Sequence, residues 1–152
     1  MKKVLIATSV FFFLTSLVLG YILLYKGTDL VKMPNDPRTS VKYPPDIEKL
    51  VLSEMRDYLE IINEINQGIA ENNPERITKA AYRQGKSSIE ETPTRLLKLS
   101  PMPCKTMGFR GHDLFQAIGD SAKTNYNPQT IQKQMAELTN NCIACHRSYR
   151  IN

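Results

Sequence analysis

Apolar residues recur at steps of three and four positions through most of the chain after residue 45, which is the spacing of one face of an α-helix. The longest run predicts a helix from about Pro45 to Asn72. Asn73 and Pro74 predict the start of a second helix, reaching about Ser88, because a side-chain acceptor followed by proline is typical of a helix start. The apolar face of the first helix consists of Ile47, Leu50, Val51, Met55, Tyr58, Leu59, Ile62, Ile65 and Ile69.

The remaining pattern predicts two further helices. Residues 92–105 contain three prolines and no sustained period, so we expect a connection there with one short turn at residues 95–97. A third helix is expected over residues 108–123, and Asn127 with Pro128 begins a fourth that runs to the C-terminus. Because no stretch has the alternation of a strand, the sequence predicts an all-α fold, an antiparallel four-helix bundle. The inward seam of the fourth helix is Ile131, Met135, Leu138, Cys142, Cys145 and Tyr149.

The N-terminal segment, residues 1–26, differs from the rest. Two lysines precede and one follows an uncharged stretch, residues 4–25, which is long enough to cross a bilayer core as a helix. This stretch is either an uncleaved transmembrane anchor or a long signal peptide, and the apolar residues that continue beyond Gly20 favour the anchor. The leading lysines place the remainder on the periplasmic, oxidising side of a bacterial inner membrane.

The chain after this segment divides into a linker and one domain. Residues 27–44 carry prolines among polar residues, which predicts an extended linker and not a packed element. Residues 45–152 are about one hundred residues of amphipathic pattern, enough for one small hydrophobic core.

The positive net charge carries little information about partners. The formal charge is +5, but three basic residues lie in the first 26 positions and all acidic residues follow them, so the excess outside the membrane falls to two. The remaining lysines and arginines are scattered along the sequence, so we expect them to lie on a solvated surface. The composition therefore gives no indication of nucleic-acid binding.

The chemistry of the chain is concentrated near its end, in Cys142-Ile143-Ala144-Cys145-His146. On a helix, Cys142, Cys145 and His146 stand at i, i+3 and i+4 and leave on one face. This spacing is typical of covalent haem attachment, in which the two thiols form thioethers with the porphyrin and the imidazole binds iron as the proximal ligand. We therefore expect one covalent haem c.

Three other interpretations of this motif are a dithiol redox pair, half of a zinc site and a structural disulfide. A zinc site needs more ligands, and only Cys104 and His112 remain, far upstream. A thioredoxin-like pair belongs at the start of a helix, whereas this one lies near the end of a long helix. Together with export, these points favour haem.

The sequence resembles the cytochrome c′ family, the class II c-type cytochromes. The resemblance rests on a haem motif in the last helix instead of the first, on Cys142-x-x-Cys145-His146-x-x-Tyr149-Arg150, and on four predicted helices. It covers roughly residues 45–150. It implies a periplasmic four-helix bundle, often dimeric, that transfers electrons or binds small gases.

The resemblance also implies where the second axial ligand lies. Family members place the distal residue on the first helix, and an ungapped comparison of helix starts brings Met55 to that position. A methionine there implies a low-spin electron carrier, whereas a bulky apolar residue leaves iron five-coordinate and reactive toward gases. Arg150 matches the family's basic residue beside the proximal histidine, where its charge would favour neutral imidazole and ferrous iron.

Several of these residues have a second interpretation. Met55 can be a core filler, and a register shift of one turn would put Tyr58 or Leu59 in its place. Arg150 can be a solvated cation at a helix end. Cys104 is either a buried unpaired thiol or an intersubunit disulfide. His112 is a secondary candidate ligand, and Met102 and Met107 are expected to pack.

The sequence thus predicts a membrane-tethered, single-electron c-type cytochrome that serves redox partner proteins and forms a homodimer if it follows the family. The alternative is a five-coordinate haem protein that binds nitric oxide or carbon monoxide, and a third possibility is a thiol or metal-binding protein without haem. We expect no enzyme, because no acid–base pair or nucleophile constellation is present.

Overall fold

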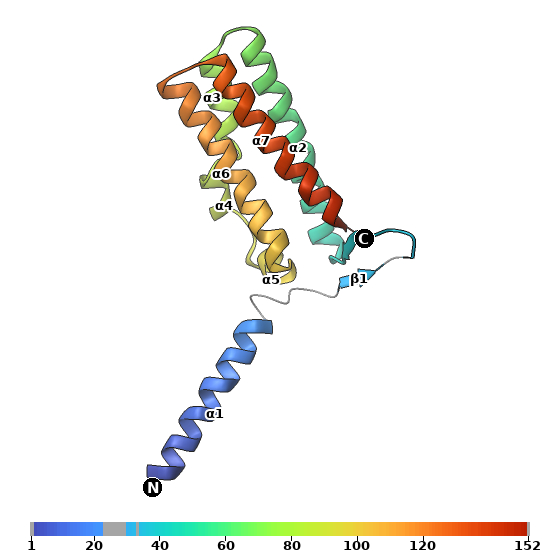
Figure 1. Ribbon diagram of the computed structural model, residues 1–152, viewed down its shortest axis with the longest axis vertical. Helices are drawn as coiled ribbons and strands as arrows, with labels where there is room; N and C mark the ends of the chain where they lie inside the picture. Colours follow the sequence, from blue (N-terminus) through green and yellow to red (C-terminus); the bar gives the residue numbers. More distant parts are fainter. Residues whose placement is uncertain (1, 23–29, 33, 152) are drawn as a thin grey trace.

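The computed structural model describes residues 2–22, 30–32 and 34–151, and the described chain is mostly helical (Figure 1). This confirms the predicted helical character and the apolar N-terminal helix. In chain order the elements are α1 (Lys2–Gly20), β1 (Leu30–Lys32), β2 (Thr39–Val41), α2 (Pro45–Ala70), α3 (Pro74–Tyr82), α4 (Ser87–Glu90), α5 (Thr94–Leu99), α6 (Met102–Thr124), α7 (Pro128–Ser148) and β3 (Tyr149–Ile151).

Helix α1 is long and apolar enough to cross a membrane, with a mean hydropathy of 2.0 and no buried side chain. A signal sequence near the N-terminus has the same features, so α1 is either kind of segment. The far end of the predicted apolar stretch, residues 23–25, and the start of the predicted linker lie outside the described residues.

The main core lies among the four longest helices that follow α1. Helix α3 packs against α2 and α6, α6 also packs against α7, and α2 approaches α7 at fewer points (Figure 1). The buried residues of this main core are Ile61, Ile65, Ile77, Ala80, Ala81, Phe115, Ile118, Ala122, Ile131, Met135 and Leu138.

The helix boundaries follow the local chemistry of their ends. The Asn73 and Asn127 side chains each accept a backbone hydrogen bond at 3.0 Å, as their predicted N-cap roles require. Helix α2 ends close to its predicted limit, and Asn72 just beyond it has a positive φ of 50°, which asparagine tolerates at a helix end.

Helices α3 and α6 differ from their predicted limits. Helix α3 ends at Tyr82 instead of Ser88, and the separate short helix α4 follows. Helix α6 starts at Met102, before the predicted residue 108, because Pro103 lies in the first helical turn, where its missing N–H is not needed. The short predicted turn at residues 95–97 is present as part of α5.

The prediction that the chain contains no strand is wrong. Strands β1 and β2 pair antiparallel, and β2 pairs in parallel with β3, Thr39 opposite Tyr149 and Val41 opposite Ile151. The last helix consequently ends at Ser148 and does not continue to the C-terminus. Strands of three residues are too short for alternation to be detected in sequence, and the pairing of β2 with β3 joins segments more than a hundred residues apart.

The prediction of an unpacked linker is wrong for its described part as well. Val41 and Tyr43 are buried, and the Tyr43 hydroxyl lies 2.7 Å from Ser100 Oγ. The Ser100 hydroxyl itself donates to the Leu96 carbonyl, so Tyr43 is the donor in this pair. Residues 41–43 therefore contact α5, the residue that follows it and the strand that follows α7. The second, smaller core formed here consists of Val41, Tyr43, Ile47 and Leu96, with Leu50, Val51, Leu99, Tyr149 and Ile151 packed against it.

Candidate functional site

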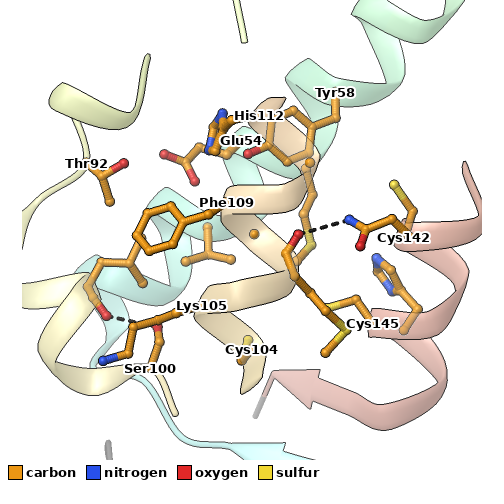
Figure 2. Close-up of a pocket in the computed structure, with 18 of the residues that line it drawn as sticks. Glu54, Tyr58, Thr92, Ser100, Cys104, Lys105, Phe109, His112, Cys142 and Cys145 are labelled. Atoms are coloured by element: carbon orange, nitrogen blue, oxygen red, sulfur yellow. Dashed lines mark hydrogen bonds between the residues drawn. The ribbon is translucent and has the colours of Figure 1, made fainter. Parts of the chain in front are cut away.

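A largely apolar cavity opens between α2, α5, α6 and α7 (Figure 2). It contains about 980 Å³ of space not filled by protein atoms, part of it open to solvent. The wall combines the end of α7 with the facing sides of α2 and α6, so residues far apart in the sequence meet there. The lining residues are Tyr43, Val51, Glu54, Met55, Tyr58, Thr92, Leu96, Leu97, Ser100, Cys104, Lys105, Met107, Gly108, Phe109, Gly111, His112, Phe115, Leu138, Asn141, Cys142, Cys145 and His146.

The three residues of the predicted attachment motif all line this cavity. Cys142, Cys145 and His146 lie in the last turns of α7, where a spacing of three and four residues puts them on one face. Both thiols are half-buried and the imidazole is exposed, whereas Ile143, between the cysteines, points to solvent and is 48 % exposed. One face of α7 therefore carries two sulfurs and an imidazole into the same space.

Met55 lines the cavity from α2, the helix that faces this end of α7. Of the two register alternatives, Tyr58 also lines the cavity, but Leu59 is 68 % exposed and is excluded. The structure thus brings the predicted distal residue and the attachment motif to one cavity.

Helices α6 and α7 are held in register beside the motif. Asn141 Nδ2 donates to the Met107 carbonyl at 2.9 Å, so Met107 contributes both a cavity wall and a link between the helices. Interaction between the Cys104 and Cys145 side chains raises the pKa of Cys104 and lowers the pKa of Cys145. Burial raises the pKa of Cys142.

A group of polar side chains occupies one end of the cavity. Figure 2 shows Glu54, Tyr58 and His112 together there. Burial raises the pKa of Glu54, and the charge of Asp57 adds to this effect. Burial is also the main cause of the raised pKa of Tyr58. Sequence reasoning missed Glu54 as a lining residue, although its place one turn before Tyr58 on the apolar face was a usable signal.

The hydrogen bonds of His112 define its tautomer. Its Nδ1 lies 3.0 Å from the Gln84 carbonyl and 2.9 Å from Ser88 Oγ, and the Ser88 hydroxyl donates to the Gly85 carbonyl. Because a carbonyl can only accept, Nδ1 carries the hydrogen, and Nε2 of the neutral ring is an acceptor. The ring meets Tyr58 edge to face with centroids 6.2 Å apart. His112 therefore borders the cavity as an oriented imidazole.

Arg150 does not lie with the other predicted site residues. It belongs to β3, and its guanidinium pairs with Asp36 at 3.2 Å, while Asp36 also pairs with Arg38 at 2.7 Å. Arg38 is the main cause of the strongly lowered pKa of Asp36. Among the described residues that line the cavity Arg150 is absent, and so is Met102. The ion pair between Arg150 and Asp36 links the segment before β2 to the C-terminal strand.

Comparisons with protein-family models, curated proteins and solved structures found no match to this chain. The resemblance to cytochrome c′ therefore stays a prediction. Within the described residues, no group of three or more His, Cys, Asp and Glu side chains is arranged to hold a metal ion.

Proposed function

We propose that this protein is a c-type cytochrome of the cytochrome c′ kind, in which α2, α3, α6 and α7 form a four-helix bundle around one covalent haem. The observation that carries the proposal is that Cys142, Cys145 and His146 share one cavity with Met55 from a facing helix. Four residues separated by up to 91 positions would then have complementary roles: two thiols that would attach the group and two side chains that would bind its iron.

The lining of the cavity fits such a group in its chemistry, because most of the lining is apolar and a few polar side chains lie at its end. Phe109, Phe115 and Leu138 provide apolar wall, as a flat macrocycle requires. When bound, haem supplies one-electron iron chemistry that no side chain of this site supplies.

Each residue of the chain has a defined task in this proposal. The thiols of Cys142 and Cys145 would hold the group covalently, and the His146 imidazole would bind its iron. The soft thioether of Met55 would be a second iron ligand and would favour the ferrous state. The apolar wall would lower the local dielectric constant around the iron, which would tune its potential.

The proposed activity is single-electron transfer on the periplasmic side of a bacterial inner membrane. His146 and Ile143 are exposed at the end of α7, so the attached edge of the haem would lie near the surface, where a redox partner protein can approach. Helix α1 would hold the domain at the membrane if it is not cleaved. A homodimer, expected from the resemblance, is tested by analytical ultracentrifugation of the full chain in detergent.

The test is the optical spectrum of the native protein and of Met55→Ala. We expect a low-spin spectrum in the native protein and its loss in Met55→Ala, because the second axial ligand is removed. Met102→Ala is the matched control, since Met102 is a partly buried methionine that does not line the cavity. A low-spin spectrum that survives in Met55→Ala contradicts the role of Met55.

One observation favours the second candidate, a five-coordinate haem protein that binds nitric oxide or carbon monoxide. The cavity contains the hydroxyl of Tyr58 and the oriented imidazole of His112, both able to hydrogen-bond a small ligand. This candidate predicts a high-spin native spectrum, unchanged in Met55→Ala, and rapid binding of carbon monoxide by the reduced protein.

A further inference from the structure

The cavity contains a third sulfur that the proposed function does not use. Cys104 lies in the first turn of α6, is half-buried, and lines the same cavity as Cys142 and Cys145. The sequence alone left Cys104 as an unpaired thiol or an intersubunit disulfide. Its surroundings inside one protein chain point to a different partner.

The register of α6 against α7 places Cys104 opposite Cys145. The two helices are consecutive and antiparallel, and the Asn141 side chain links them by donating to the Met107 carbonyl at 2.9 Å. Three residues back from Met107 on α6 is Cys104, and four residues on from Asn141 on α7 is Cys145. One turn beyond the Asn141 link, the two cysteines therefore face each other.

Helices α6 and α7 pack against each other around this link. A Cβ added at Gly111 would lie 3.8 Å from Asn141 Nδ2, so the Asn141 side chain lies at contact distance from α6. Cys104 and Cys145 line the same cavity from these two facing helices. Figure 2 shows both residues at the end of the cavity away from His112. Cys142, one turn earlier on α7, shares only a helix face with Cys145.

We propose that Cys104 is a third reactive thiol of the attachment site and forms a reversible disulfide with Cys145 in the haem-free protein. The oxidant is a disulfide, either of a periplasmic oxidoreductase or of oxidised glutathione. The thiols of Cys104 and Cys145 lose two protons and two electrons as their S–S bond forms, and the oxidant's S–S bond opens to two thiols. Cys142 keeps its thiol.

The consequence for haem attachment rests on the proposed function. A sulfur held in a disulfide has no thiol to form a thioether, so the Cys104–Cys145 bond has to be opened by a reduced dithiol before Cys145 can be used. In the oxidising periplasm this bond would protect Cys145 from overoxidation and from pairing with other proteins. Once haem is attached, Cys104 returns to a thiol beside Tyr43 and Ser100.

The test uses the full chain, exported in a host that lacks a haem-attachment apparatus, then alkylated without reduction and mapped by peptide mass spectrometry. We expect Cys104 and Cys145 to be joined in one cross-linked peptide pair and to escape alkylation, with Cys142 alkylated. The matched controls are Cys142→Ser, which should keep the cross-link, and Cys104→Ser, which should lose it and release Cys145 for alkylation or for pairing with Cys142.

A cross-link between Cys142 and Cys145 in the native chain overturns the proposal, and so does alkylation of all three cysteines or dimers joined through Cys104. Because an unfolded chain favours the nearest pair, a misfolded product also gives the overturning result. A parallel expression with the attachment apparatus tests the proposed function by itself. Covalent haem in that expression, together with no Cys104–Cys145 cross-link in the chain made without the apparatus, overturns only this inference. The cross-link in the chain made without the apparatus, together with no haem in the parallel expression, overturns only the proposed function.

Discussion

Leu138 provides a test of whether the cavity holds a packed group, because its side chain belongs both to the main core and to the cavity wall. Leu138 and Ile65 are equally inaccessible, each 0 % exposed, but Ile65 does not line the cavity. Truncation of a buried leucine or isoleucine to alanine costs about 2–5 kcal/mol, and the cost rises with the volume left unfilled.

The two truncations should differ in the haem-free protein. Leu138→Ala widens a space that already lacks packing partners on one side, so we expect a loss near the lower limit, about 2–3 kcal/mol, against about 3–5 kcal/mol for Ile65→Ala. Haem attachment gives Leu138 new apolar neighbours and leaves Ile65 unchanged. At roughly 0.8 kcal/mol per buried carbon group, the Leu138→Ala penalty should rise by roughly 1–2 kcal/mol in the haem-loaded protein.

Urea unfolding of the full chain in mild detergent, followed by far-ultraviolet circular dichroism, measures both penalties with and without attached haem. Leu59→Ala is the surface control, since Leu59 is 68 % exposed and its loss should change the free energy of unfolding by less than about 0.5 kcal/mol. A Leu138→Ala penalty that stays the same on haem attachment, or that changes in step with Ile65→Ala, refutes the reasoning.

Three further predictions concern the scaffold. Gly119→Ala should lower the thermal midpoint clearly, because the new Cβ would lie 2.4 Å from the Tyr82 ring; differential scanning calorimetry checks this, and an unchanged midpoint contradicts it. Arg38 holds the pKa of Asp36 below its ordinary value of 3.8, so the contribution of Asp36 to stability is present above pH 3.8 and is lost as the pH falls below it. In acid unfolding, Asp36→Asn should therefore lose less stability below pH 3.8 than the native protein does. Identical acid unfolding curves for the two proteins argue against this role of Asp36. Burial raises the pKa of Tyr43 to about 12, so the contribution of Tyr43 to stability is complete below pH 10 and is lost as the pH rises toward 12. Tyr43→Phe should therefore lose less stability at alkaline pH than the native protein. Equal slopes of stability against pH for the two proteins would count against this.

The long helices were predictable because the features that define them are local in sequence. The Asn73 and Asn127 side chains each accept a hydrogen bond from a backbone N–H three residues further on, so a short stretch of sequence contains both partners. The strands were not predictable, since β2 is defined by pairing with residues after α7 and by burial of Val41 against α5, and neither partner is close in sequence.

In the candidate site too, the residues with a local sequence pattern were predictable, and the residue whose position depends on contacts distant in sequence was not. Cys142, Cys145 and His146 were identified because a single helical turn contains the whole motif. Met55 needed a comparison of helix starts, and it does line the cavity. Arg150 was expected beside His146 because the resemblance implies a basic residue there; in the structure it lies in β3 and pairs with Asp36. The position of Arg150 depends on packing between elements, which the spacing of residues in the sequence does not encode.

The most direct test of the central claim is the mass and colour of the denatured chain. Expressed with a haem-attachment apparatus, the protein should migrate in denaturing gels with haem still bound, and its mass should exceed that of the polypeptide by one haem. Replacement of Cys142 and Cys145 together by alanine should abolish both signals. A colourless chain with the mass of the bare polypeptide contradicts the account.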